Sequence, residues 1–307
     1  MKLSVIICTH NPHPGYLRRT LDALKAQTLQ REQWELLFID NGSKEHLAES
    51  WDLSWHPHAR HIREDELGVT PARLRGIRES QSELLVMVDD DNILRFDFLV
   101  NAVEISNAYP FLGAWGASIE GEFEHQVPHW LKPHLHTLAV RAVNRDYWSN
   151  YYPDHRSMPV GAGLCIRKSV AVAHARALAT RPASVKLDRK GSSLVSGGDI
   201  DLAMTAYDCG LGTGVFQRLQ ITHIIPKARM TVDYLCRLLE GIEYSTHLLR
   251  HQRNPNYCPL EENSKSKRWF RAYQVWRLPE PTRSFVQAEN RGLARAKAEI
   301  AAKPTGI

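Results

Sequence analysis

The chain has 307 residues, a net charge of +5 at pH 7 and 43% hydrophobic residues, a composition typical of one large globular domain or of one domain with a tail. It contains no apolar run long enough to cross a bilayer, and its apolar start is too short for a signal peptide. The five cysteines are widely spaced and form no CxxC pair, which predicts a reduced, cytoplasmic protein.

Strands and helices are predicted to alternate in the first ninety residues. The predicted strands are LSVIIC (3–8), WELLFID (34–40), ARHIRE (59–64) and ELLVMVD (83–89), and the predicted helices are YLRRTLDALKAQT (16–28) and TPARLRGIRES (70–80). The second helix has Thr70 as its expected N-cap and Pro71 in its first turn. Strands that are apolar on both faces and alternate with helices indicate an α/β fold with a mostly parallel, doubly wound sheet.

The second half of the chain is less regular, but it also mixes strands and helices. We expect a pair of strands in 111–124, a strand entering a helix in 159–178, a helix near 197–210, a short strand in 219–226 and long helices in 230–250 and 288–303. From about Asn254 the sequence becomes basic and aromatic. We therefore predict one catalytic domain over residues 1–253 and a helical extension over residues 254–307.

Polar residues follow three of the predicted strands at the point where each strand ends. These clusters are THN (9–11), DNGS (40–43) and DDDN (89–92). Because parallel strands end at one edge of a sheet, where ligands bind in such folds, the clusters predict a pocket. Three adjacent carboxylates suit a divalent ion that is bound together with a phosphorylated ligand. An isolated DxD triplet is more often a solvated turn, but the preceding strand and the neighbouring clusters favour binding.

Other candidate residues have two interpretations each. Asp199 and Asp201 in the first turn of a helix are most often caps, but the preceding glycines allow a ligand to approach, so Asp199 is a candidate general base. Asp40 belongs either to an ordinary turn or to a site for a base or ribose. His223 in an apolar strand is more often structural than a ligand. The turn after the first strand is not glycine-rich, which disfavours dehydrogenases and nucleotidyltransferases.

The motifs taken together resemble a known family. SVIICTHN, FIDNGS, GVTPARLRGI, MVDDDN and GGDIDL occur in the order found in the inverting glycosyltransferases of family 2, which have the GT-A fold. GAWGASIEGEFE, PVGAGLCIRK and THIIPKARMTVDYL are similar to a bacterial polysaccharide-building subgroup, the hormogonium polysaccharide transferases. The resemblance covers roughly residues 1–240. It implies a GT-A domain with a Rossmann-like sheet flanked by helices, followed by the C-terminal helical extension.

The resemblance implies where the nucleotide binds. The end of the first strand, with Thr9 and Asn11, lines the nucleotide, and Asp40 contacts the base. The arginine near the diphosphate corresponds to Arg73, with Arg75 as an alternative, because Leu74 replaces the asparagine that is usual in this segment.

The resemblance also implies a metal site and a base. Asp91 corresponds to the direct ligand of Mg²⁺ or Mn²⁺, Asp89 lies near the ribose, and Asp90 shares either role. The general base corresponds to Asp199, although Gly198 replaces the preceding glutamate of the family. His223 matches a late histidine that completes the metal site.

The expected activity is therefore transfer of a sugar (a hexosyltransferase reaction) from a nucleotide-diphosphate sugar, a UDP-sugar before others, to a hydroxyl of a glycan or lipid-linked acceptor in polysaccharide biosynthesis. Nucleic acid is not an expected partner. The alternatives are a sugar nucleotidyltransferase, which consumes a triphosphate, and a non-catalytic protein of the same fold that binds nucleotides or glycans.

The segment SKSKRWFRAYQVWRL (264–278) supports a separate hypothesis. Its basic and aromatic residues suit an interfacial helix on anionic lipid, at the inner face of the membrane. The alternative, which the sequence favours slightly, is a helix packed on the catalytic domain with its charges in solvent.

Overall fold

The structure, a computed structural model, describes residues 1–151, 154–180, 194–195, 197–259 and 265–302. The chain divides into two compact units. The first comprises Met1–Glu124, Leu138–Ala183 and Gly198–Ile225, and the second His125–Thr137, Ser184–Gly197 and Pro226–Ile307. The division between a catalytic domain that ends at residue 253 and an extension from 254 stays a prediction.

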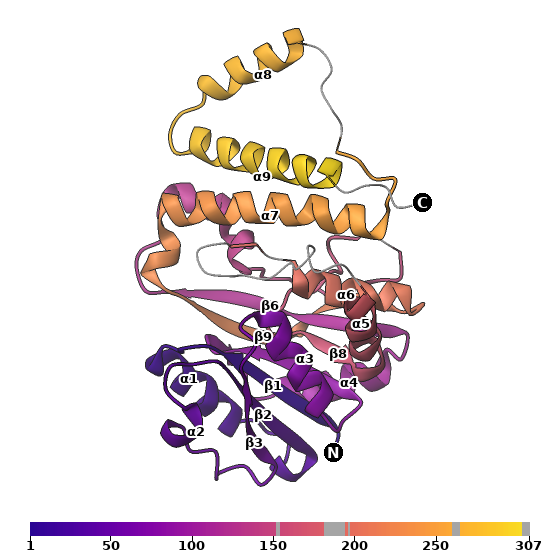
Figure 1. The fold of residues 1–307 in the computed structure, drawn as a ribbon. Coiled ribbons are helices and arrows are strands. Elements are labelled where there is room, and N and C mark those ends of the chain that lie inside the picture. The colour runs from indigo at the N-terminus through magenta and orange to yellow at the C-terminus, as the bar shows by residue number, and fades with distance from the viewer. Residues whose placement is uncertain (152–153, 181–193, 196, 260–264, 303–307) are drawn as a thin grey trace. The chain divides into compact units, whose positions relative to one another are not determined.

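The first unit is built on one nine-stranded sheet (Figure 1). The strands are β1 (Leu3–Thr9), β2 (Trp34–Asn41), β3 (Ala59–Glu64), β4 (Leu84–Asp89), β5 (Asn92–Leu94), β6 (Leu112–Phe123), β7 (Tyr147–Ser149), β8 (Cys165–Arg167) and β9 (Gly212–Ile225). Their order is β3-β2-β1-β4-β8-β6-β9-β5, with β7 beside β9. The first four strands are parallel, and β8 is antiparallel to both neighbours, β4 and β6. The predicted α/β class is confirmed.

Helices cover both faces of this sheet. On one face, α1 (Pro14–Lys25) and α4 (Phe98–Ala108) pack their apolar sides on the strands in one buried core. On the other face, α3 (Val69–Glu79) contacts β1 and β2. Next to α3 lies α5 (Lys168–Thr180), which in turn contacts α6 (Gly198–Asp208). A Cβ atom on Gly76 would lie 2.4 Å from Cγ2 of Ile6, so this glycine lets α3 approach β1 closely. The short α2 (Leu47–Ser50) follows β2.

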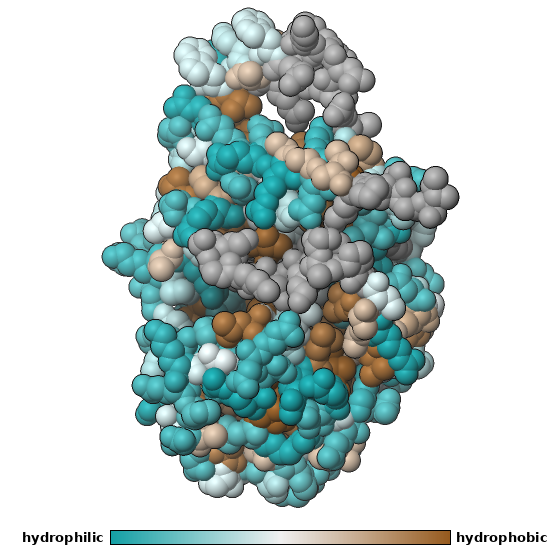
Figure 2. Space-filling view, viewed as in Figure 1, coloured by the Kyte–Doolittle hydropathy of each residue, from teal (hydrophilic) through white to brown (hydrophobic). Residues whose placement is uncertain are grey.

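The second unit contains the C-terminal helices. Here α7 (Val232–Arg253) and α9 (Thr282–Ala302) pack along one another, and α8 (Lys265–Trp276) precedes α9 (Figure 1). The Tyr244 hydroxyl donates a hydrogen bond to Glu299, and the Arg295 guanidinium lies 4.1 Å from the centre of the Tyr244 ring. In the described residues, 3₁₀ helices occupy Arg31–Gln33, His129–Leu138 and Lys227–Met230. The face shown in Figure 2 is mostly hydrophilic, with scattered apolar side chains. Among the described helices, none is both long enough and apolar enough to span a bilayer.

Three local predictions were wrong. The segment 111–124 forms one long strand, β6, because its glycines serve packing and not a turn: a Cβ on Gly116 would lie 2.8 Å from Pro159. The short strand expected at 219–226 is the second half of the 14-residue β9. Thr70 is not the N-cap of α3, since the helix begins one residue earlier and Gly68, with φ of 140°, precedes it.

A buried carboxylate holds the end of β2. Asp40 is 6% exposed and accepts hydrogen bonds from the Ser43 and Leu47 amides at 3.0 and 3.4 Å. Arg63, the register partner of Asp40 on β3, donates a hydrogen bond from Nη1 to Asp40 Oδ2 at 2.6 Å. Burial alone would raise the pKa of Asp40, but the hydrogen bonds from Ser43, Arg63 and Leu47 outweigh burial and hold the pKa below its ordinary value. The ionised carboxylate therefore stabilises the fold.

Substitution of Asp40 by asparagine should lower the free energy of unfolding by roughly 1–3 kcal/mol at pH 7, since the guanidinium and two amides lose a charged acceptor. Because the folded-state pKa is depressed, this contribution is present above the unfolded pKa of about 3.9 and is lost as the pH falls through the folded value. Denaturant unfolding of both proteins at neutral pH and near pH 3 measures it.

Asp65→Asn is the matched control, because Asp65 contacts the same guanidinium at 2.9 Å but is 84% exposed. It should change the free energy of unfolding by less than about 1 kcal/mol. A difference between the Asp40→Asn variant and the unmodified chain that stays constant down to pH 3 would contradict the role given to the ionised carboxylate.

Candidate active site

The ends of β1 and β4 are joined by hydrogen bonds through residues Asp89–Asn92, here called the acidic turn. Cys8 on β1 is the register partner of Asp89 on β4. The Thr9 hydroxyl donates to the Asp90 carboxylate, and the Thr20 hydroxyl donates to the Asp90 carbonyl at 3.1 Å. The side chain of Asp90 is therefore held toward β1.

A second set of hydrogen bonds joins the loops after β1 and β2. Asn11 has φ of 46°, a left-handed conformation that asparagine tolerates. Its amide donates to Ser43 Oγ at 2.9 Å, and its Oδ1 accepts from the Lys44 amide at 2.9 Å. Thr9 and Asp40 are register partners on the neighbouring strands. The residues predicted to line the nucleotide thus lie at one edge of the sheet.

Asn41 is a residue that the sequence interpretation missed. Its side-chain amide donates to the carbonyls of Glu64 and Glu66 at 3.1 and 2.7 Å, and its Oδ1 accepts from the Gly68 amide at 2.9 Å. Its own carbonyl contacts His10 Nδ1 at 2.7 Å. Asn41 therefore connects the loops that follow β1, β2 and β3 at the edge of the site. The sequence DNGS could not indicate these partners, because they lie far from it in the chain.

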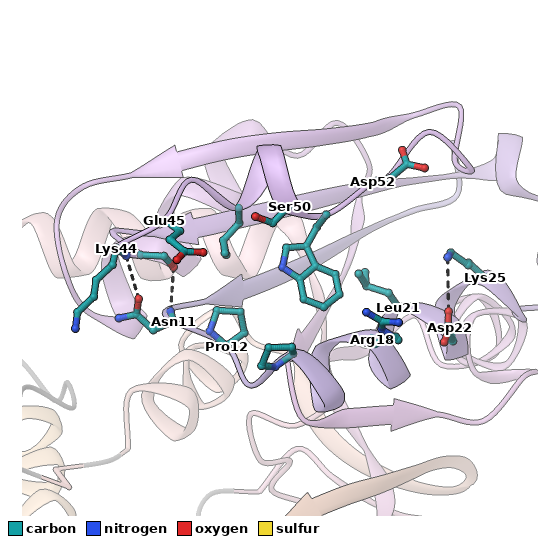
Figure 3. Close-up of a pocket in the computed structure, with 14 residues that line it drawn as sticks. Asn11, Pro12, Arg18, Leu21, Asp22, Lys25, Lys44, Glu45, Ser50 and Asp52 are labelled. Carbon is teal, nitrogen blue, oxygen red and sulfur yellow. Dashed lines mark hydrogen bonds and ion pairs between the residues drawn. The ribbon is translucent and has the colours of Figure 1, made fainter.

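A cavity of about 800 Å³ opens beside Asn11 and Ser43, between α1 and the segment that follows β2 (Figure 3). Its lining combines the apolar Leu21, Leu47 and Trp51 with charged side chains from both segments, which include Arg18 and Asp52. No residue of the acidic turn lines it. The cavity thus lies at the Asn11 end of the site and apart from the carboxylates.

A cluster of charged groups gathers around Asp89. Arg73 Nη2 on α3 lies 3.7 Å from Asp89 Oδ1. Burial is the largest influence and raises the pKa of Asp89; Asp91 and Asp199 raise it further, while Arg73 and His223 lower it. These five side chains therefore share one electrostatic neighbourhood, although they come from separate parts of the sequence.

Asp91 and His223 form a buried pair. Asp91 Oδ2 lies 3.4 Å from His223 Nε2, and each side chain is 9% exposed. The pairing of β5 with β9 sets this contact, since Asn92 is the register partner of His223. The side-chain amide of Asn92 also donates a hydrogen bond to Asp91 Oδ1 at 3.0 Å. The late histidine is thereby placed beside the acidic turn.

Asp199 lies in the first turn of α6, where the helix dipole favours a carboxylate. Its Oδ2 accepts a hydrogen bond from the Gly161 amide at 2.7 Å. A Cβ on Gly161 would lie 2.8 Å from Arg73 Nη2 and 3.0 Å from Asp199 Oδ2. Gly161 thus lets Arg73 and Asp199 converge on one point.

The structure shows other partners for Asp201 and Arg75, the residues close in sequence to the preferred candidates Asp199 and Arg73. Asp201 is 1% exposed, and its Oδ2 lies 4.0 Å from His174 Nδ1 inside the unit, so it is the partner of a structural histidine. Arg75 pairs with Glu79 on its own helix at 3.1 Å. Arg73, and not Arg75, is the arginine paired with the acidic turn.

The donors around Asp91 suit a divalent metal that a ligand completes. No group of three or more His, Cys, Asp or Glu side chains arranged to hold a metal ion is found among the described residues. Two ligand atoms on one octahedral ion lie roughly 3 Å apart, so Asp91 and His223 are spaced to share one. Mg²⁺ takes only one or two protein carboxylates when phosphate oxygens and water supply the rest. The residues present therefore fit such an ion.

Comparison with solved structures returns proteins of the same fold. Residues 1–349 of TarS from S. aureus share 13% identity with a TM-score of 0.53, over 98% of this chain and 91% of that chain. The same protein in complex with UDP-GlcNAc gives 12% identity and a TM-score of 0.55, over 98% and 83%. GalNAc-T7 with UDP, GalNAc and Mn²⁺ gives 14% identity and a TM-score of 0.53, over 89% of this chain and 54% of that chain. At such identities the likeness shows the fold alone.

The comparison with curated proteins gave no significant match. Residues 4–160, about half of the chain, match the family described as glycosyl transferase family 2. The match includes β1, β2, α3 and the acidic turn after β4, which carry Thr9, Asp40, Arg73 and Asp89–Asp91, whereas Asp199 and His223 lie beyond the matched residues. The chain belongs to glycosyl transferase family 2 and is a glycosyltransferase with the GT-A fold.

Proposed function

We propose that the protein is an inverting, metal-dependent glycosyltransferase that uses a nucleotide-diphosphate sugar. The observation that carries this proposal is the convergence of Arg73 and Asp199 on Gly161, in the same charged cluster as Asp89, Asp91 and His223. This arrangement supports a site in which Arg73 would bind the diphosphate, Asp91 and His223 would bind a metal ion, and Asp199 would act as the base.

The proposed donor is a UDP-sugar. Structurally similar TarS has been solved with UDP-GlcNAc and with UDP, which supports this choice. Thr9, Asn11 and Asp40 would line the base and ribose at the ends of β1 and β2, with Asp90 held beside Thr9. Asp89 would face the ribose, and Arg73 would reach the diphosphate. The hydrogen bonds of Asp40 fix the loop that carries Ser43, so its contribution to base binding includes positioning that loop.

Asp91 and His223 would hold Mg²⁺ or Mn²⁺, and the presence of Mn²⁺ in the structure of GalNAc-T7 agrees with this assignment. Such an ion, when bound, supplies positive charge that stabilises the negative charge developing on the departing diphosphate. Without it, Asp89, Asp91 and Asp199 would repel a diphosphate, and within this cluster the groups that offset their negative charge are Arg73 and His223.

Asp199 would act as the general base. It takes the proton from an acceptor hydroxyl while the hydroxyl oxygen forms a bond to the anomeric carbon. The bond from that carbon to the diphosphate oxygen breaks, and its electron pair leaves with the nucleoside diphosphate. Attack from the opposite face inverts the anomeric configuration. The Gly161 amide holds one oxygen of Asp199, which leaves the other oxygen for the acceptor.

We propose as acceptor a hydroxyl of a glycan or of a lipid-linked saccharide, in polysaccharide biosynthesis at the cytoplasmic face of the membrane. The motifs shared with the hormogonium polysaccharide transferases support this proposal. A nucleotidyltransferase would instead release pyrophosphate from a triphosphate, and a non-catalytic protein would release nothing. The assays below distinguish these alternatives.

Asp199→Asn should lower the rate of UDP release from a UDP-sugar and acceptor by roughly 10²–10⁴-fold, because the amide cannot take the acceptor proton. Binding of UDP with Mn²⁺ should stay unchanged, since the side-chain oxygen of asparagine still accepts from the Gly161 amide. Coupled detection of UDP measures the first effect and calorimetric titration the second.

Asp208→Asn, at the exposed end of the same helix, is the matched control and should keep full activity. Near-normal turnover by Asp199→Asn would show that another group acts as base. A product with the anomeric configuration of the donor sugar would refute the single displacement.

Asp91→Asn should abolish the metal dependence of nucleotide binding. In the unmodified chain, UDP at about 100 times its dissociation constant with Mn²⁺ adds about 2.7 kcal/mol of stability and raises the melting temperature by a few degrees. The variant should show the same small shift with Mn²⁺ and with EDTA, because one of two protein donors is lost.

Asp97→Asn serves as control, since Asp97 lies past the acidic turn and pairs with Arg95 at 2.6 Å. A metal-dependent shift that persists in Asp91→Asn would place the ion elsewhere. Comparison of UDP with GDP, dTDP and CDP in the same assay identifies the preferred base.

A further inference from the structure

Helix α8 exposes an unusual number of large aromatic side chains. Trp269 is 71% exposed, Trp276 65%, Phe270 54% and Tyr273 41%. Other exposed aromatic residues lie elsewhere in the chain; among them, Trp148 on β7 contacts Phe111, with the ring centres 5.1 Å apart. The four rings of α8 are not buried against α9, the helix that α8 contacts, and they are therefore available to a binding partner.

Three of these rings form one row. Trp269, Tyr273 and Trp276 follow the spacing i, i+4, i+7 of a single helix face. The centres of neighbouring rings lie 5.9 and 6.0 Å apart, and the rings are stacked. The guanidinium of Arg277 lies 5.9 Å from the centre of the Tyr273 ring. The row is thus an apolar ridge with a cation at its end.

The charge of the same segment has one sign. Between Lys265 and Arg277 the sequence holds five basic residues and no acidic residue. The backbone of the twelve helical residues spans about 18 Å, so the five basic positions are distributed over little more than two Debye lengths at physiological salt. Such a segment attracts a surface that is itself densely anionic.

We propose that α8 binds the surface of an anionic lipid bilayer, with the aromatic row in the interface and the basic residues against the lipid headgroups. Tryptophan and tyrosine favour this region because their rings are amphipathic, and basic residues near an anionic leaflet contribute about 1 kcal/mol each. This surface would bring the enzyme to lipid-linked acceptors, but the lipid contact itself does not depend on the proposed reaction.

Other occupants fit less well. A second copy of α8 would bring two strongly basic segments together, which repel each other. A neutral glycan carries no negative charge that five basic residues could bind. The rings are stacked on one another, so they do not form the flat surface on which a sugar ring packs. An anionic bilayer satisfies both the apolar row and the charge.

The test is sedimentation of the full chain with vesicles of phosphatidylcholine alone and of phosphatidylcholine mixed with phosphatidylglycerol. We expect binding only to the mixed vesicles, and weaker binding as salt rises from 0.1 to 1 M and the screening length falls from about 10 to about 3 Å. Trp269→Ala with Trp276→Ala should lower the partition coefficient by roughly tenfold or more. Lys267→Gln and Arg268→Gln should lower it by about fivefold each.

Trp148→Ala is the control, because Trp148 is also an exposed tryptophan and should leave vesicle binding unchanged. Unchanged melting temperatures would show that all variants fold. Equal binding to both vesicle types, no binding to either, or undiminished binding by the tryptophan variant would overturn the proposal, as would a dimer that only the α8 variants lose. Because the assay contains no donor sugar, its failure leaves the proposed transferase activity untouched.

Discussion

The electrostatic constraint on which the site depends is the crowding of like charges where β4 ends. Asp89 and Asp91 share their surroundings with Asp199, and this crowding helps to raise the pKa of Asp89. Such an arrangement costs free energy in the protein alone, because each carboxylate disfavours the ionised form of the next. It becomes favourable when cations are present. Arg73 provides one, and Asp91 with His223 can hold another.

The rest of the first unit keeps these charges in place. Hydrogen bonds hold the loops after β1 and β2 to one another, and Asn41 connects them to the segment before α3. The pairing of β5 with β9 places His223 next to Asp91, and Gly161 leaves room for Arg73 beside Asp199. A preorganised set of charges of this kind needs little rearrangement when a charged ligand arrives.

The sequence was informative where local pattern decides structure. Buried strands, amphipathic helices and the acidic turn follow from the order of apolar and polar residues. The motifs at the ends of these strands then identified the correct family by resemblance. It was uninformative where distant residues meet. The glycines of β6 resembled turn residues because the residues that pack against them, such as Pro159, lie elsewhere in the chain. The partners of Arg75 and Asp201, which are Glu79 and His174, likewise became visible only in the fold.

The central claim is that the protein supplies only part of a metal site and the nucleotide diphosphate supplies the remainder. Titration of Mn²⁺ followed by electron paramagnetic resonance, with and without UDP, tests it most directly. The account predicts weak binding of Mn²⁺ alone and much tighter binding with UDP, and an equal gain in UDP affinity when Mn²⁺ is present, because coupling between two ligands is reciprocal. Mn²⁺ affinity that UDP does not change would contradict it.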